Sequence, residues 1–136
     1  MNKIILKLSI FALLIMSVSC ATTHPDMSDK YNFDELEEIK EISKYRVSSW
    51  ERVDFQSVIL RANSKDYYLL VLQRPMSGII TGDKIGISNT VTSIKAGVDK
   101  IYVRDSSKVN YYIIDKIYKL NGREHAIQVK KQIRKS

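Results

Sequence analysis

The chain has 136 residues, of which 44% are hydrophobic and 27% charged, a composition typical of one globular domain and not of a disordered chain. Its net charge of +7 favours anionic partners, although a charge of this size can also serve solubility alone. The presence of a single cysteine excludes a disulfide within the chain.

Residues 1–19 have the pattern of a secretory leader. Lys3 and Lys7 accompany a short apolar run at residues 8–16, and small residues end the segment immediately before Cys20. This run is shorter than the stretch of about 20 apolar residues that a transmembrane helix needs. We therefore predict removal of residues 1–19, which would leave 117 residues with a net charge of +5.

The end of the leader resembles the lipobox of bacterial lipoproteins. Val18, Ser19 and Cys20 fit that pattern, whereas Ser17 stands where leucine is usual. The resemblance implies that Cys20 carries a diacylglyceryl group and an amino-terminal acyl chain such as palmitate, which together fix a protein to a membrane. Ala21, in place of aspartate, implies the outer membrane and a domain that faces the periplasm. Cleavage by an ordinary signal peptidase would instead give a soluble periplasmic protein.

Two different segments follow the predicted cleavage site. Residues 20–32 are polar and are predicted to be a flexible tether in which His24 is solvated. Phe33, Leu36 and Ile39 then recur at a spacing of three, which predicts a short amphipathic helix at residues 33–42.

The rest of the chain reads as short strands separated by turns. Residues 57–62 and 66–73 are predicted to form a hairpin around a turn at 63–65, and the second strand is apolar on both faces, as in the centre of a sheet. Further strands are predicted at residues 45–53, 84–88, 91–94, 100–104 and 109–115, and residues 116–120 could extend the last of these. The predicted class is α+β and mostly β, with one short N-terminal helix on a small antiparallel sheet or open barrel.

Residues 33–136 are thus predicted to form a single domain that ends in a basic C-terminal tail at residues 130–135. Residues 26–41 carry a net charge of −5 and residues 116–135 a net charge of +6. The two segments could attract each other, the tail could contact anionic lipid, or the tail could simply be solvated.

Four motifs lie between residues 45 and 120, a stretch that makes up most of the mature domain: Trp50-x-x-Val53-Asp54, residues 68–75, residues 99–103 and residues 112–120. This pattern resembles a family of small proteobacterial envelope lipoproteins of unknown function, which implies no activity for this chain. Members commonly carry one cysteine after an Arg-Pro pair and another before the last isoleucine-rich strand. Met76 and either Tyr111 or Tyr112 stand at those positions, which implies that packing replaces a bridge.

Residues able to perform catalysis are sparse. The sequence has no nucleophile motif, phosphate loop or zinc-binding pattern, so we expect neither an enzyme nor a cofactor or metal. His125, beside Glu124, is predicted to be an ordinary surface histidine. The eight tyrosines suit strands, and because export separates the protein from nucleic acid, we expect no nucleic-acid partner. Trp50, Tyr67 and Tyr111 remain as candidates for a ligand groove.

The sequence therefore predicts a non-enzymatic binding or assembly accessory, attached to the membrane through acylated Cys20. Envelope proteins or anionic envelope polymers are its expected partners. The alternative is a soluble periplasmic binding module for a small ligand or glycan.

Overall fold

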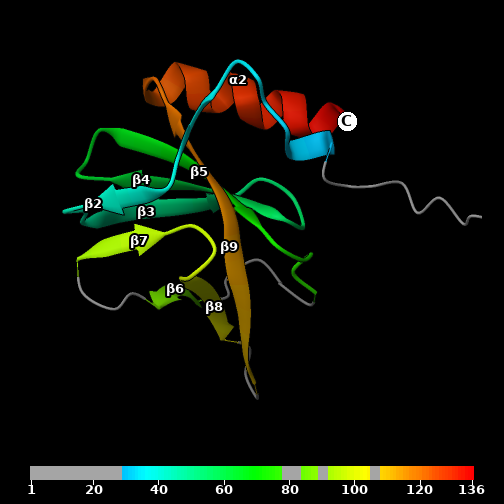
Figure 1. The fold of residues 1–136 in the computed structure, drawn as a ribbon. Helices are drawn as coiled ribbons and strands as arrows, with labels where there is room; N and C mark the ends of the chain where they lie inside the picture. The colour runs from blue at the N-terminus through cyan, green and yellow to red at the C-terminus, as the bar shows by residue number, and fades with distance from the viewer. Residues whose placement is uncertain (1–28, 78–83, 89–91, 105–107) are drawn as a thin grey trace, which may run out of the picture.

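The computed structural model describes residues 29–77, 84–88, 92–104 and 108–136 (Figure 1). Strands account for 52% of the described residues and build a curled antiparallel sheet in the form of a half-barrel. The elements in chain order are η1 (Asp29–Tyr31), β1 (Glu37–Ile39), β2 (Glu41–Ser43), β3 (Val47–Arg52), β4 (Ser57–Ala62), β5 (Asp66–Leu72), β6 (Lys84–Ser88), β7 (Ser93–Lys95), β8 (Lys100–Arg104), β9 (Val109–Leu120) and α2 (Gly122–Lys135).

The main sheet has the strand order β3-β4-β5-β9-β8-β6, and β1 pairs with β9 as a seventh strand. The last part of β9 pairs with β5 and its first part with β8. Between these parts Lys116 faces Val71 whereas Ile114 faces Leu72, so Asp115 is an extra residue in a bulge. A bulge bends a strand and increases its twist, which allows β9 to serve both halves of the curled sheet.

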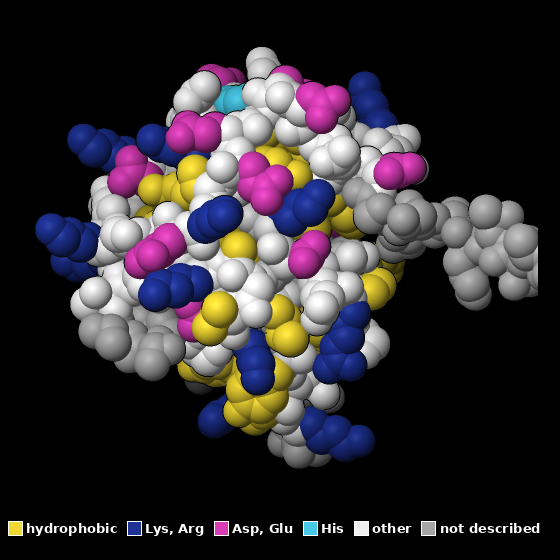
Figure 2. All heavy atoms as spheres, viewed as in Figure 1, with side chains coloured by type: hydrophobic (Ala, Val, Ile, Leu, Met, Phe, Trp, Pro, Cys, Tyr) yellow, Lys and Arg dark blue, Asp and Glu magenta, His cyan; other side chains and the backbone are white. Residues whose placement is uncertain are grey.

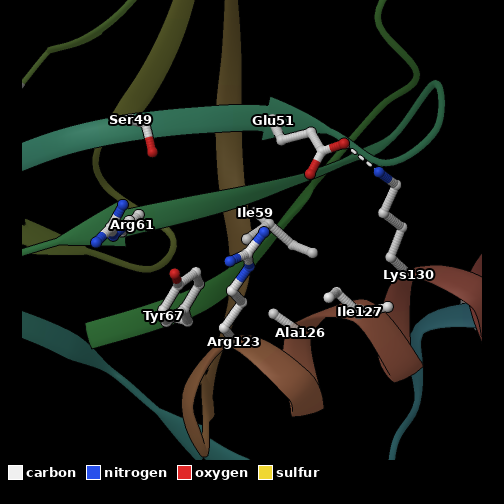
Figure 3. A pocket seen from close by; sticks show the side chains of 9 residues that line it. All are labelled: Ser49, Glu51, Ile59, Arg61, Tyr67, Arg123, Ala126, Ile127 and Lys130. Atoms are coloured by element: carbon white, nitrogen blue, oxygen red, sulfur yellow. Dashed lines mark hydrogen bonds and ion pairs between the residues drawn. The ribbon is translucent and has the colours of Figure 1, made fainter. Parts of the chain in front are cut away.

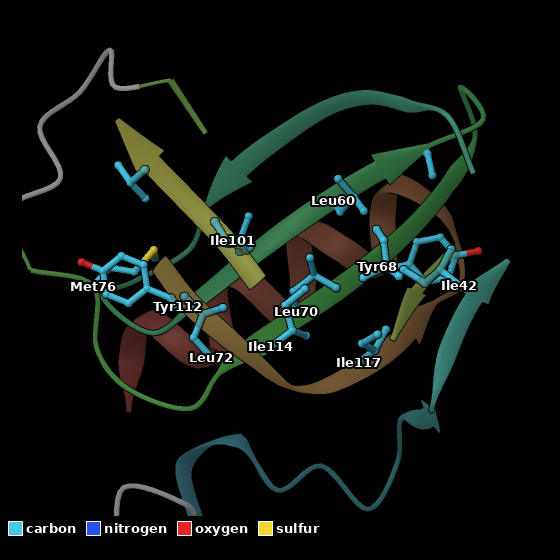
Figure 4. Packing of buried hydrophobic residues seen from close by; sticks show 14 residues of the cluster. Ile42, Leu60, Tyr68, Leu70, Leu72, Met76, Ile101, Tyr112, Ile114 and Ile117 are labelled. Carbon is cyan, nitrogen blue, oxygen red and sulfur yellow. The ribbon is translucent and has the colours of Figure 1, made fainter. Parts of the chain in front are cut away.

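The sheet has two buried faces, and β5 shows why. Its Tyr68, Leu70 and Leu72 point into the concave side, whereas Leu69 and Val71 point to the convex side. The concave cluster is shown in Figure 4, and the small β2–β7 sheet packs against it through Ile42 and Ile94. Helix α2 and residues 31–36 cover the convex side. The prediction of a central strand that is apolar on both faces is therefore confirmed.

The two positions that relatives are expected to fill with cysteine lie in the concave cluster. Met76 and Tyr112 are both buried members of this cluster, and Figure 4 labels both. The Tyr112 hydroxyl donates a hydrogen bond to the Ser77 carbonyl at 3.4 Å. Tyr111, the other candidate, is 52% exposed. Of the two tyrosines, Tyr112 is therefore the one that shares the buried cluster with Met76.

The prediction of an N-terminal helix is wrong. Residues 33–36 form a turn in which the Leu36 amide donates to the Phe33 carbonyl, and the chain then continues as β1 and β2. Phe33 and Leu36 pack on the convex side, whereas Ile39 and Ile42 pack on the concave side. The apolar spacing of three thus reflects a segment that crosses the edge of the sheet, because pairing with β9 overrides local helix propensity.

The fold class is corrected accordingly: the protein is mostly β, but its helix is C-terminal. Residues 130–135, predicted to be a basic tail, belong to α2, which packs on the sheet through Ala126, Val129 and Ile133. Tyr31, placed in the tether by the sequence, is only 2% exposed, so packing reaches back at least to this residue.

Most predicted strands are confirmed, including the hairpin of β4 and β5. Its turn residues Asn63 and Ser64 have φ values of +50° and +67°, the left-handed conformations of a tight hairpin turn. The strand predicted at residues 91–94 is β7, although residue 91 lies outside the described residues.

Candidate functional site

A groove with a volume of about 480 Å³ lies between helix α2 and the edge of the convex face (Figure 3). We call it the α2 groove. Its sheet wall comes from β3, β4 and β5, and its helix wall from residues of α2 spaced three or four apart, which share one face of the helix. The groove is lined by Ser49, Glu51, Ile59, Arg61, Tyr67, Arg123, Ala126, Ile127 and Lys130.

Strand register places the polar groups of the sheet wall. Ser49 pairs with Arg61, and Arg61 pairs with Tyr67, so these three side chains form one row across three strands. The Arg61 guanidinium donates to the Ser64 carbonyl at 2.7 Å through Nε and lies 5.8 Å from the centre of the Tyr67 ring. These contacts hold the charge of Arg61 in place at one end of the groove.

The helix wall adds two more cations. Lys130 pairs with Glu51, the one acidic residue of the lining, as the dashed line in Figure 3 marks. The Arg123 side chain is exposed and makes no ion pair or hydrogen bond with another described residue. Because Lys130 is neutralised by Glu51, Arg61 and Arg123 give the groove an excess of positive charge. Their planar guanidinium groups suit carboxylate or phosphate, which they can bind through two hydrogen bonds.

The three aromatic residues predicted to share a groove do not come together. Tyr67 lines the α2 groove, whereas Trp50 packs against the concave cluster on the other face of the sheet. Tyr111 lies on the first part of β9, with its ring centre 6.3 Å from that of Tyr102. Alternation along β3 explains the separation, because Ser49 and Glu51 face the helix and Trp50 between them must face away.

His125 has a structural contact near the start of α2. Its Nδ1 accepts a hydrogen bond from the Asn121 amide at 3.0 Å. This bond satisfies a backbone donor at the helix N-terminus, where such donors lack partners within the helix. The described residues contain no group of three or more histidine, cysteine, aspartate or glutamate side chains that could hold a metal ion.

The most connected carboxylate is Asp54, in the turn between β3 and β4. It accepts hydrogen bonds from the Tyr31 hydroxyl at 2.6 Å, the Ser57 hydroxyl at 2.7 Å and the backbone amide of Gln56 at 2.9 Å. Lys30 Nζ lies 3.2 Å from the same group. We call this cluster the Asp54 latch, because it ties the first described residues to the sheet.

The latch shifts two pKa values in opposite directions. Burial raises the pKa of Tyr31 well above its ordinary value of 10, and the hydrogen bond and charge of Asp54 add to this effect. Burial alone would also raise the pKa of Asp54. The hydrogen bonds from Tyr31, Ser57, Gln56 and Lys30 outweigh that effect and lower the pKa of Asp54 below its usual value.

We predict that the latch makes stability fall at both extremes of pH. The Asp54 contribution is present above the unfolded pKa of about 3.9 and is lost as the pH falls through the lower folded pKa. The Tyr31 contribution is present below pH 10 and is lost as the pH rises through its raised folded pKa. Urea denaturation at a series of pH values should show both losses.

Two variants separate the loss of stability at acidic pH from the loss at alkaline pH. Asp54→Asn should be less stable than the wild type at neutral pH and should approach it at acidic pH, while Tyr31→Phe should flatten the alkaline arm. Parallel acid profiles for wild type and Asp54→Asn would contradict the proposed linkage.

Cys20 and the leader lie outside the described residues. In the part of the chain that the structure covers, no helix is both long and apolar enough to cross a membrane.

Comparisons with known proteins give one match. The model of a family described as "Family of unknown function (DUF6491)" matches residues 2–136. No curated protein and no solved structure matches the chain significantly. Because the match covers nearly the whole sequence, the chain belongs to the DUF6491 family of unknown function.

Proposed function

We propose that this protein is a lipid-anchored accessory of the cell envelope whose domain binds an anionic partner in the α2 groove and performs no catalysis. The leader and Cys20 support an anchor on the outer membrane, with the domain in the periplasm. The likeness of its motifs to small proteobacterial envelope lipoproteins agrees with this location. A soluble periplasmic module that uses the same groove for a small ligand or glycan is the alternative.

The observation that carries the binding proposal is the unequal charge of the groove. Three cations line it, Arg61, Arg123 and Lys130, and only Glu51 opposes them. Arg61 is held in position by Ser64 and Tyr67, so little conformational freedom is lost when it binds an anion. Acidic glycans present carboxylates along an extended chain, which suits an open groove with two guanidinium groups.

The positive charge of the protein is not confined to the groove. In Figure 2 acidic and basic side chains are mixed over the upper part of the visible face, whereas the lower end shows basic and hydrophobic groups. The β6–β8 end of the sheet lies there in the same view (Figure 1). A test of the groove must therefore distinguish it from general attraction between a basic protein and a polyanion.

The test is the binding of a fluorescently labelled oligogalacturonate, measured by anisotropy against a neutral glucan oligomer of equal length. We expect the anionic oligomer alone to bind, more weakly as salt increases. Arg123→Glu should lower the affinity about tenfold, the equivalent of one charge-assisted hydrogen bond. Arg104→Glu makes the same charge change at an exposed position on β8 and should alter the affinity less than about twofold. Equal losses for the two variants, or no binding, would contradict the proposal.

A further inference from the structure

A second pocket, of about 170 Å³, lies on the opposite side of the sheet from the α2 groove, and we call it the edge pocket. Its rim comes from β3 and β6, the two ends of the strand order, and its floor from β4, β5 and β8. It is lined by Val47, Trp50, Val58, Leu60, Leu70, Ile85, Gly86, Ile87 and Ile101. The curl of the half-barrel therefore leaves an apolar space between its two free edges.

The lining of the edge pocket is apolar apart from the indole nitrogen of Trp50. An engineered apolar cavity of about 150 Å³ stays dry and takes up benzene or xenon, so a space of this kind accepts an uncharged group of similar size. The Tyr102 ring packs directly on Gly86 and closes this part of the pocket wall, since a Cβ atom at Gly86 would lie 2.0 Å from the ring. The apolar side chains of the lining can thus hold a short length of alkyl chain.

The mouth of the edge pocket allows the rest of a longer molecule to remain outside. Val47 is 44% exposed, and Trp50, Ile85 and Ile87 are only partly buried. A polar hollow of about 550 Å³, lined by Arg46, Val47, Ser48, Asn63 and Ser64, shares Val47 with the pocket. Arg46 is the one charged residue of that hollow, and its side chain is exposed and makes no ion pair with another described residue.

We propose that the edge pocket binds the end of a single alkyl chain whose anionic head group lies beside Arg46. The ligand class is a fatty carboxylate or a comparable single-chain anionic amphiphile. Burial of each methylene group contributes about a fourfold increase in affinity until the pocket is full. Because the pocket and the α2 groove lie on opposite faces of the sheet, this inference does not depend on the proposed function.

Trp50 makes the proposal directly testable, since it is the one tryptophan of the chain and lines the pocket. The probe is 12-bromododecanoate, kept below its micelle concentration and added to the purified full chain. Its terminal bromine quenches indole fluorescence at contact distance. We expect saturable quenching. The affinity of the probe should fall about two- to fivefold in Arg46→Gln, and the neutral probe 12-bromododecanol should bind the wild type more weakly by the same factor. A change of this size corresponds to one solvent-exposed charge interaction.

Two variants obstruct the pocket. Ile87→Phe adds volume inside it, and Val47→Phe adds volume at the exposed rim, where folding should tolerate the change. Both variants should lower the affinity of the probe, measured by quenching, at least tenfold. Ile127→Phe, in the α2 groove, should leave this affinity unchanged. An absence of saturable quenching, or equal quenching in wild type, Ile87→Phe and Val47→Phe, would overturn the proposal.

Discussion

Replacing Val129 by aspartate is expected to lower the free energy of unfolding by about 4 kcal/mol, the range reached when a core contact is replaced by an unpaired charge. Val129 is 3% exposed and lies between Ala126 and Ile133 on the face of α2 that packs against Ile59 and Leu69. An aspartate there must either be buried without a partner or force the helix away from the sheet. Guanidinium denaturation followed by circular dichroism measures the loss.

The neighbouring residue supplies the control. Gln128 is exposed on the same helix, so Gln128→Asp introduces the same charge on the solvent side. It should change stability by less than about 0.5 kcal/mol. Equal effects of Val129→Asp and Gln128→Asp would mean that residues 122–135 do not pack on the sheet, and the α2 groove would then lack its helix wall.

Replacing Asp54 by alanine is expected to destabilise the protein by about 3 kcal/mol, because several partly buried donors lose their acceptor together. Tyr31 and Ser57 would be left with unpaired hydroxyl groups, and the Gln56 amide and Lys30 would lose the same partner. Tyr31→Phe removes only one of these bonds and should cost about 1 kcal/mol.

Asp34→Ala is the matched control, since Asp34 is exposed in the same N-terminal segment. It should leave stability within about 0.5 kcal/mol of the wild type. Limited proteolysis of Asp54→Ala should in addition cut residues 29–36 sooner than in the wild type. Unchanged proteolysis together with unchanged stability would show that the Asp54 latch does not hold this segment.

The latch has a consequence for an anchored protein. The segment that leads back toward Cys20 joins the domain next to Asp54, at the end of β3. Arg134 at the end of α2 donates to the Val53 carbonyl at 3.0 Å, so the first described segment and the end of α2 meet the same turn. Under the proposed anchor at Cys20, this fixed attachment point would limit how the domain is oriented beside the membrane.

The sequence predicted the hairpin of β4 and β5 because both its turn and its apolar pattern are local signals. Asn63 and the continuous apolar run at residues 67–72 can be read without knowledge of the rest of the chain. A local signal of the same kind at residues 33–42 led to the wrong prediction of a helix there. A spacing of three fits a helix, but it fits equally a turn followed by strands that cross a sheet edge.

Helix α2 did leave a signal that the basic charge of the segment obscured. Ala126, Val129 and Ile133 follow helical spacing, Glu124 lies in the first turn, and basic residues occupy the last turn. The α2 groove left no such signal. Its row of Ser49, Arg61 and Tyr67 exists only through strand register, which depends on pairings that a single sequence does not display.

The most direct test of the proposed envelope accessory is the intact mass of the protein extracted from its native membrane fraction. We predict a mass equal to residues 20–136 plus a diacylglyceryl group and one acyl chain on Cys20, and loss of membrane association in Cys20→Ala. A mass equal to unmodified residues 20–136, recovered from the soluble periplasmic fraction, would contradict the anchor and favour the soluble binding module.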